Sequence, residues 1–220
     1  DNPAMAAIAT SVAAALREAG YAMILADTHD RPDLQDFHLK AMRAQLVQGY
    51  VLVSAVKSPG LATIVASGAP VLFVNRRNPM SRADAFVGVD NRAAGADAAR
   101  FFLARGIESL AVLHSALTSL AIADRVAGFL DALAQAGVPA DKVARASAPG
   151  LAHLEVGYAA ACDLVGRCGW PKGILCVSDM MAYGAHRYAM ECGVAVPGDC
   201  LMVGIDDNAA CNIRHAAKCT

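Results

Sequence analysis

Short apolar, β-rich runs alternate with longer Ala/Leu-rich stretches along almost the whole chain, and this alternation most constrains how it can fold. The β-rich runs lie near residues 21–26, 50–54, 70–74, 86–89, 109–113, 143–146, 173–177 and 200–205. The helical patterns lie near residues 4–19, 32–48, 58–67, 91–104, 122–136, 154–167 and 179–192. Strands that alternate with helices in this way form βαβ units, whose strands are parallel. The sequence therefore predicts an α/β protein built on parallel sheets.

The helical stretches carry apolar residues at the spacing of one helix face. In the stretch 32–48 these residues are Leu34, Phe37, Ala41, Met42 and Leu46, and the stretch 122–136 has Val126, Phe129, Leu130 and Leu133. An apolar stripe of this kind packs against a sheet. Glycines follow several of these stretches, among them Gly49, where a left-handed closing residue costs glycine little.

Length and composition limit the classes of protein that this chain can belong to. At 220 residues it can form one large α/β unit or two lobes of about 100 residues each. Hydrophobic residues make up 56% of the chain, but no apolar run approaches the roughly 18 residues that span a membrane. The net charge is −1 and no Lys/Arg cluster is dense enough to follow a phosphate backbone, so we do not expect this chain by itself to bind nucleic acid.

The cysteines and the first residues bear on the cellular compartment. The seven cysteines are an odd number and contain no C-x-x-C pair, which predicts reduced thiols in a cytoplasmic protein. The first residues, DNPAMA, lack the features of a secretory signal. A processed periplasmic protein would also begin without its signal, so that observation does not separate the two compartments.

Acidic residues follow two buried-strand patterns near the end of the chain. Asp179 comes soon after the run 173–177, and Asp206 and Asp207 follow the run 200–205. Ligands of open parallel sheets bind beyond the carboxyl ends of the strands. We predict Asp206 as the acceptor of ligand hydroxyl groups. Asp179 is expected to cap a helix, and Asp207 to cap the next segment or turn outward.

Arg125 lies in the first turn of its predicted helix, where a cation opposes the positive end of the helix dipole. An oxygen-rich partner would compensate for this placement, and the guanidinium carries donors that suit vicinal hydroxyls or a carboxylate. Asp206 would also counter its charge. The alternative is an ordinary surface ion pair with Asp124 or another acid.

Several segments, in order and spacing, resemble the effector-binding core of the lactose-repressor and galactose-repressor (LacI/GalR) transcription regulators, which is itself similar to periplasmic sugar-binding proteins. The segments that carry the resemblance are Gly20-Tyr21 with Leu25 and Thr28, 48–53 (QGYVLV), 68–76 (GAPVLFVNR), 87–91 (VGVDN) with Gly95, 103–107 (LARGI), 125–129 (RVAGF), 178–184 (SDMMAYG) and 196–207 (VPGDCLMVGIDD).

The resemblance implies two similar three-layer lobes with parallel sheets, joined by crossovers, at about 1–103 and 104–220. An effector would lie in the cleft between them. The family has a further strand before this core and a segment after Asp207 that returns to the first lobe, so we expect the chain to be a fragment.

The resemblance also implies ligand contacts. It places an effector-binding arginine at Arg125 and favours ligand contact over helix capping for Asp90. Ser178 stands where many relatives have Asn. Asn75 and Arg76 end a strand, with a solvated rim as the alternative role for Arg76. His153 is a minor candidate, close to where relatives place an aromatic residue. No histidines pair at metal-ligand spacing, and we expect neither a metal nor a cofactor.

The leading hypothesis is therefore the effector-binding and dimerisation region of a LacI-family regulator that senses a sugar, sugar phosphate or purine in the cytoplasm. It would form a homodimer, have no membrane partner, and reach DNA only through an upstream helix-turn-helix absent from this chain. The alternative is a periplasmic sugar-binding protein of a transporter. An enzyme ranks third, because the sequence has no G-x-G-x-x-G after a first strand, phosphate loop, G-x-S-x-G elbow or H-E-x-x-H.

Overall fold

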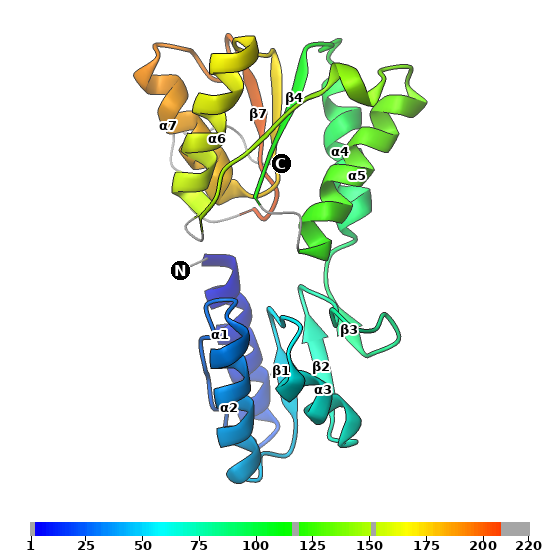
Figure 1. Ribbon diagram of the computed structural model, residues 1–220, viewed down its shortest axis with the longest axis vertical. Helices are drawn as coiled ribbons and strands as arrows, with labels where there is room; N and C mark the ends of the chain where they lie inside the picture. The colour runs from blue at the N-terminus through cyan, green and yellow to red at the C-terminus, as the bar shows by residue number, and fades with distance from the viewer. Residues whose placement is uncertain (1–2, 116–118, 151–152, 208–220) are drawn as a thin grey trace. The chain divides into compact units, whose positions relative to one another are not determined.

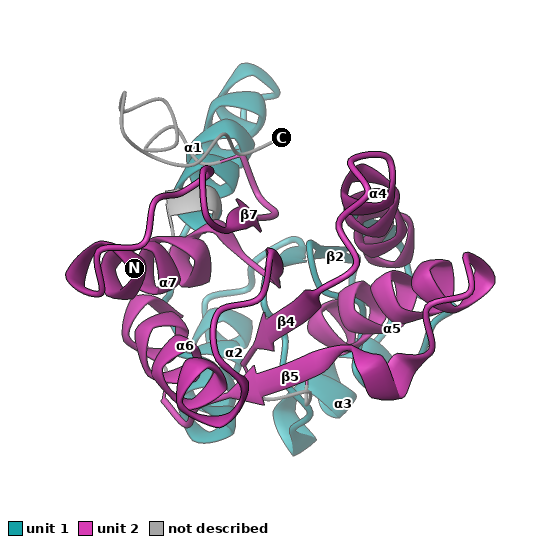
Figure 2. Ribbon diagram, turned by 90° about the horizontal axis from the view of Figure 1, so that it is seen from above, with its two compact units in different colours: residues 1–89 teal, residues 90–220 magenta. Residues whose placement is uncertain are grey.

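The computed structural model describes residues 3–115, 119–150 and 153–207, and it divides into two compact units (Figure 2). The division falls between Val89 and Asp90. All strand pairs in both units are parallel, as the alternation of strands and helices predicted.

Unit 1 is a small α/β unit with a three-stranded sheet in the order β1-β2-β3 (Figure 1). Its elements are α1 (Pro3–Glu18), α2 (Pro32–Ala44), β1 (Tyr50–Leu52), α3 (Pro59–Ala66), β2 (Val71–Val74) and β3 (Phe86–Val87). Its buried core is limited to Leu39, Tyr50, Ala55, Leu61, Ile64 and Phe73. The Gln35 side chain connects α2 to the loop after β1, because its amide donates to Val56 O and Ser58 Oγ, both at 2.7 Å.

Unit 2 has three layers around a four-stranded sheet in the order β5-β4-β6-β7. Its elements are α4 (Asn91–Leu103), β4 (Leu110–His114), α5 (Leu120–Gln135), a short 3-10 helix (Ala140–Lys142), β5 (Ala144–Ser147), α6 (His153–Cys168), β6 (Gly173–Cys176), α7 (Asp179–Glu191) and β7 (Leu201–Val203). Helices α4 and α5 lie on one face of the sheet and α6 and α7 on the other (Figures 1 and 2). Strand β6 is buried along its whole length.

Helix α4 packs closely on α5, which assigns it to unit 2. A Cβ atom at Gly95 would lie 2.0 Å from Arg125 O, and one at Gly128 would lie 2.0 Å from Arg92 O. Only glycine permits this approach of the two backbones. The unit boundary therefore falls earlier than the one expected from the sequence, near residue 103.

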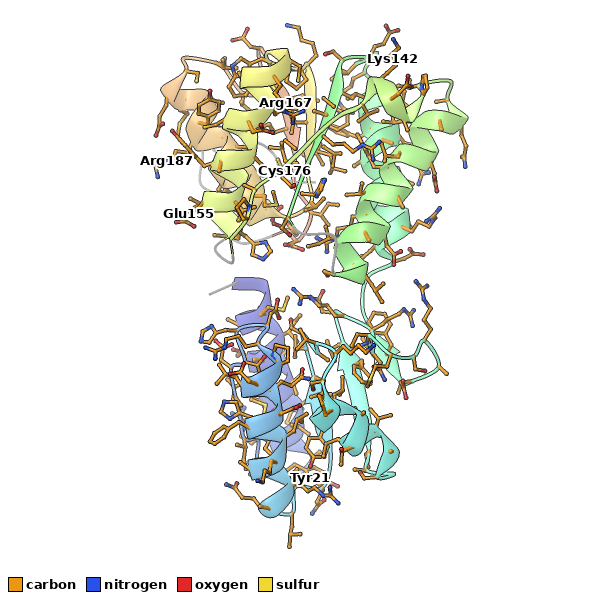
Figure 3. The ribbon with its side chains drawn as sticks, viewed as in Figure 1. Tyr21, Lys142, Glu155, Arg167, Cys176 and Arg187 are labelled. Atoms are coloured by element: carbon orange, nitrogen blue, oxygen red, sulfur yellow. The ribbon has the colours of Figure 1, made fainter. Side chains whose placement is uncertain are left out.

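Three expected features of unit 1 are wrong. Of the apolar stripe predicted in residues 32–48, Phe37 and Leu46 are exposed by 65% and 86% instead of packing on the sheet. Residues 21–26 form no strand, and Tyr21, Ile24 and Leu25 are exposed by 52%, 52% and 70% (Figure 3 labels Tyr21). A β-rich run becomes a strand only when a neighbour accepts its hydrogen bonds, and β1 makes its ladder with β2 alone among the described strands. Helix α2 ends at Ala44 instead of continuing to residue 48, because Leu46 has φ +56° and the chain turns there.

The described residues also answer two expectations from composition. None of their helices is both long enough and apolar enough to cross a membrane. Their five cysteines are free thiols, of which Cys176 and Cys200 are buried in unit 2. Cys211 and Cys219 lie outside the described residues.

Candidate functional site

Arg125 is buried near the amino end of α5, with 7% of the residue exposed. Its Nε donates to Asn91 Oδ1 at 2.7 Å. Its Nη1 donates to Val177 O at 2.5 Å and to Asp206 Oδ1 at 3.2 Å. The guanidinium thus connects α5 to the start of α4 and to the chain just beyond β6 and β7. The alternative of a surface ion pair with Asp124 is wrong.

The partners of Arg125 explain how a cation can be buried at this place. A buried charge is tolerated when it is paired and its donors are hydrogen-bonded. Asp206 supplies the counter-charge, with 15% of its side chain exposed, while Asn91 and Val177 supply neutral acceptors. Among the described residues, no hydrogen bond to Arg125 Nη2 is seen. That nitrogen has two donors available for a ligand.

Asp206 is held in an unusual backbone conformation, with φ +145°. Non-glycine residues rarely adopt positive φ, and such strain occurs preferentially at functional sites. Burial raises the pKa of the Asp206 carboxyl above its usual value; the Arg125 charge opposes this rise, and the Asp179 carboxylate adds to it. The backbone N–H of Asp179 also favours the charged form. Because Arg125 takes Oδ1, the second oxygen can accept a hydrogen bond from a ligand hydroxyl.

Asp179 is the first residue of α7 and is completely buried. Its backbone N–H donates to Ile205 O at 3.1 Å, which joins the start of α7 to the end of β7. A Cβ atom at Gly204 would lie 2.3 Å from Asp179 Oδ1, so glycine leaves the space that this carboxylate fills. The sequence predicted Asp179 as a helix cap. That prediction is wrong, because Ser178 is the capping residue.

Ser178 and Asp90 both cap helices. Ser178 is the N-cap of α7, and its Oγ accepts a hydrogen bond from Met181 N at 3.4 Å. Asp90 is the N-cap of α4, and its Oδ1 accepts a hydrogen bond from Ala93 N at 3.0 Å. Capping does not prevent ligand contact, since each side chain has further acceptor capacity. Their contact with a ligand remains a prediction.

The other predicted residues have different surroundings. His153 is the first residue of α6 in unit 2, with a buried Nδ1. Asn75 and Arg76 belong to unit 1. Asn75 has φ +64° and its amide lies 3.6 Å from Met5 Sδ, while Arg76 Nη1 pairs with Asp30 Oδ2 at 2.8 Å. Asp207, with φ +50°, follows Asp206 and is exposed.

Sequence reasoning missed Asn91 and the carbonyl of Val177. Asn91 follows the capping Asp90, and nothing in its spacing indicates which side chain it contacts. A backbone carbonyl carries no signal in the sequence. In the part of the chain that the structure describes, no group of three or more His, Cys, Asp or Glu side chains could hold a metal ion.

The fold and the position of this site beyond the ends of β6 and β7 define the class: a periplasmic-binding-protein-like α/β protein. Residues 1–205 match the family model described as periplasmic binding proteins and the sugar binding domain of the LacI family. The chain belongs to this family.

Individual relatives agree with this assignment. The chain is 31% identical over 215 residues to an uncharacterised HTH-type transcriptional regulator of Streptomyces limosus, covering 94% of this chain and 60% of that protein. It therefore spans less than two thirds of the length of this curated relative. A LacI-family regulator from Silicibacter pomeroyi is 27% identical in its crystal structure, with a TM-score of 0.79 over 93% of this chain and 76% of that one. The regulator CelR in complex with cellobiose is 25% identical, with a TM-score of 0.80 over 94% of this chain and 63% of that one.

Proposed function

We propose that this chain is the effector-binding part of a bacterial transcription regulator, and that Arg125 and Asp206 bind its effector. The observation that carries the proposal is the buried Arg125–Asp206 pair at the carboxyl ends of β6 and β7, which leaves Nη2 and one carboxylate oxygen for a ligand. A donor and an acceptor held side by side in a largely buried place suit a pair of adjacent hydroxyl groups.

The charge balance favours a neutral effector. Asp206 already compensates Arg125, and the buried Asp179 carboxylate lies close enough to raise the pKa of Asp206. An anionic ligand would add negative charge beside Arg125, whose charge Asp206 already balances. We therefore expect a neutral sugar, with sugar phosphates and purines as the other candidates. The complex of the related CelR with cellobiose is consistent with this choice.

The regulator is preferred to a transporter-binding protein because several curated relatives, among them MalR of Streptomyces coelicolor at 29% identity, are HTH-type regulators. We propose that the protein acts in the cytoplasm as a homodimer, without catalytic activity. It would contact DNA through a helix-turn-helix outside this chain. Effector binding would stabilise one arrangement of the regulator, and coupling of about 1–3 kcal/mol would change operator affinity about 5- to 150-fold.

A thermal-shift screen of the 220-residue chain tests the proposal. The probes are cellobiose, maltose, D-glucose, D-ribose, glucose 6-phosphate and hypoxanthine. A probe at 100 times its dissociation constant adds about 2.7 kcal/mol of stability. We expect a neutral sugar to stabilise the chain and Arg125→Lys and Asp206→Asn to abolish the shift.

Arg187→Lys and Asp163→Asn are the matched controls. They make the same two substitutions in exposed ion pairs that each lie within one helix, Arg187 with Glu191 and Asp163 with Arg167. These variants should keep the shift. A shift that survives both Arg125→Lys and Asp206→Asn would move the site elsewhere, and turnover of a probe would contradict the absence of catalysis.

A further inference from the structure

Asn91 accepts a hydrogen bond from Nε of the Arg125 guanidinium, whereas the residues that follow β6 and β7 contact only Nη1. The Nε–Oδ1 distance is 2.7 Å, and Asn91 is buried, with 9% of the residue exposed. Asn91 is also the first residue of α4, one residue after Asp90, at which unit 2 begins. The chain that enters unit 2 therefore contacts the proposed effector arginine almost at once.

The contact fixes the direction of the guanidinium. Nη1 is held by Val177 O and Asp206 Oδ1, and Nε is held by Asn91 Oδ1. Two held nitrogens determine the orientation of a planar group, so the remaining nitrogen, Nη2, points in a set direction. Without Asn91 the group keeps only its Nη1 contacts, which allow it to turn about that end.

The packing of α4 on α5 keeps Asn91 in place. Gly95 and Gly128 let the two helix backbones meet, and the Asp90 cap defines where α4 begins. The backbone of a residue at the first position of a capped helix has little conformational freedom, so the position of its side chain is restricted. The acceptor is thus positioned before any ligand arrives, which reduces the entropy that binding must remove.

We infer that Asn91 is a positioning residue: it orients Arg125 for the effector and so couples effector binding to the start of α4. This inference rests on the proposed function of Arg125. It predicts that loss of the Asn91 acceptor weakens effector binding even when the fold is intact. It also predicts that effector binding protects the backbone amides at the start of α4.

The first test needs no ligand. In the ¹⁵N-labelled chain, the Arg125 Nε–H resonance, assigned by its loss in Arg125→Lys, reports the bond to Asn91 through its rate of hydrogen exchange. We expect slow exchange in the wild type and in Asn91→Asp, which keeps the Oδ1 acceptor, and at least ten-fold faster exchange in Asn91→Ala. Equal exchange in Asn91→Ala and the wild type would overturn the inference.

The second test measures affinity for the probe sugars of the screen, cellobiose first, by calorimetry. Because a hydrogen bond to a charged group contributes more than one between neutral groups, we expect Asn91→Ala to lower the affinity about ten-fold or more. Asn91→Asp, which keeps the acceptor, should restore the affinity. Cellobiose should slow the hydrogen exchange of the backbone amides of residues 88–94 in the wild type. It should not slow this exchange in Asn91→Ala.

Asn78→Ala is the matched control, since Asn78 is also a buried asparagine, in unit 1, that donates to Asp84 Oδ2 at 2.8 Å. It should lower stability and leave sugar affinity unchanged. Faster Nε exchange with unchanged affinity in Asn91→Ala would overturn the positioning role. If no probe binds the wild type, the proposed function fails, and the inference with it, while the Nε resonance still shows whether the hydrogen bond exists.

Discussion

At the scale of single residues, the energetics of the site depend on the Arg125–Asp206 pair. Each side chain is largely buried, with 8% and 15% of the side chain exposed, so each ion would lose hydration without gaining a partner if the other were removed. Burial also raises the pKa of the Asp206 carboxyl, and the charge of Arg125 opposes this rise.

We predict that Arg125→Met lowers the free energy of unfolding by about 3 kcal/mol, because it leaves the Asp206 carboxylate buried without its cation. Asp206→Asn leaves Arg125 without its counter-charge and should also destabilise. The double variant Arg125→Met/Asp206→Asn should be less destabilised than the sum of the two single changes, by about 1 kcal/mol or more. Urea unfolding at neutral pH gives the free energy of unfolding of the wild type, the two single variants and the double variant. If the effects of the two single changes are fully additive in the double variant, the two side chains are not coupled.

The sequence predicted one half of this site and missed the other. Arg125 could be found because a cation in the first turn of a helix needs compensation, and Asp206 because it follows a buried strand; their pairing is confirmed. Asn91 and Val177 O could not be found. Their contacts with Arg125 depend on which helix packs beside α5 and on how far β6 extends, and neither is a local property of the sequence.

At the scale of elements, the helices of unit 2 pack as two pairs whose backbones meet at glycines. In the pair α6 and α7, a Cβ atom at Gly157 would lie 2.2 Å from Met181 O, and one at Gly184 would lie 2.0 Å from Leu154 O. The pair α4 and α5 meets through Gly95 and Gly128 in the same way. Each pair thus has a fixed spacing, and the α4–α5 spacing positions Arg125.

Gly128→Ala should destabilise the chain by about 3 kcal/mol or more, since its methyl group would overlap Arg92 O and overpacking forces the backbones apart. Gly166→Ala is the matched control. Gly166 is also in a helix, α6, with nothing within 4 Å of the added Cβ, so alanine should stabilise the chain by about 0.5–1 kcal/mol. Thermal unfolding should show a lower melting temperature for Gly128→Ala and a higher one for Gly166→Ala than for the wild type. Similar effects of the two changes would contradict the close packing.

The outer surface of α6 and α7 carries a tyrosine, Tyr158, whose pKa is raised. Tyr158 Oη donates to Glu191 Oε2 at 2.6 Å, and this bond, with burial and the Glu191 charge, raises the pKa of Tyr158 to about 12. The unfolded value is about 10, so the folded state holds the proton more tightly. The stabilisation is complete below about pH 10 and is lost as the pH rises toward about 12.

Glu191→Gln should lower the pKa of Tyr158 toward 10 and reduce this pH-dependent loss. The difference in tyrosinate absorbance between each chain and its Tyr158→Phe version isolates the titration of Tyr158. Arg187 also pairs with Glu191, so Arg187→Met, which removes the cation, tests whether the ion pair matters to the pKa shift of Tyr158 (Figure 3 labels Arg187). An unchanged midpoint in Glu191→Gln would show that the hydrogen bond is not the cause.

The elements themselves were largely predictable, and the errors have physical causes. The expected strand at 173–177 and helix at 91–104 agree with β6 and α4 to within one residue, because buried apolar runs and capped helices are local signals. The run 21–26 has the same local signal, but none of the described strands pairs with it. The end of α2 was misplaced because Leu46, and not Gly49, adopts the left-handed conformation.

At the scale of the whole molecule, the two units differ in how much apolar surface they bury. The core of unit 2 draws on both faces of a four-stranded sheet, and its strands β4 and β6 are almost completely buried. Unit 1 has a three-stranded sheet, a small core and exposed apolar residues at 21–25. Stability follows buried apolar area, so the units should not be equally stable.

We therefore predict that unit 1 opens at lower urea concentration than unit 2. Native-state hydrogen exchange should show the largest protection in β4 and β6 and weaker protection in β1 and β2, with a separation of at least about 2 kcal/mol in opening free energy. Phe73→Ala, in the core of unit 1, should lower the first transition and leave the second almost unchanged. Leu113→Ala, in β4, is its counterpart in unit 2 and should lower the urea midpoint of the second transition.

Ligand binding gives a further check on this division. Since Asn91 and Arg125 both belong to unit 2, probe-sugar contacts with Arg125 should raise the urea midpoint of the second transition. A single cooperative transition, in which both substitutions change the protection of all amides together, would show that the two units unfold as one and would contradict this prediction.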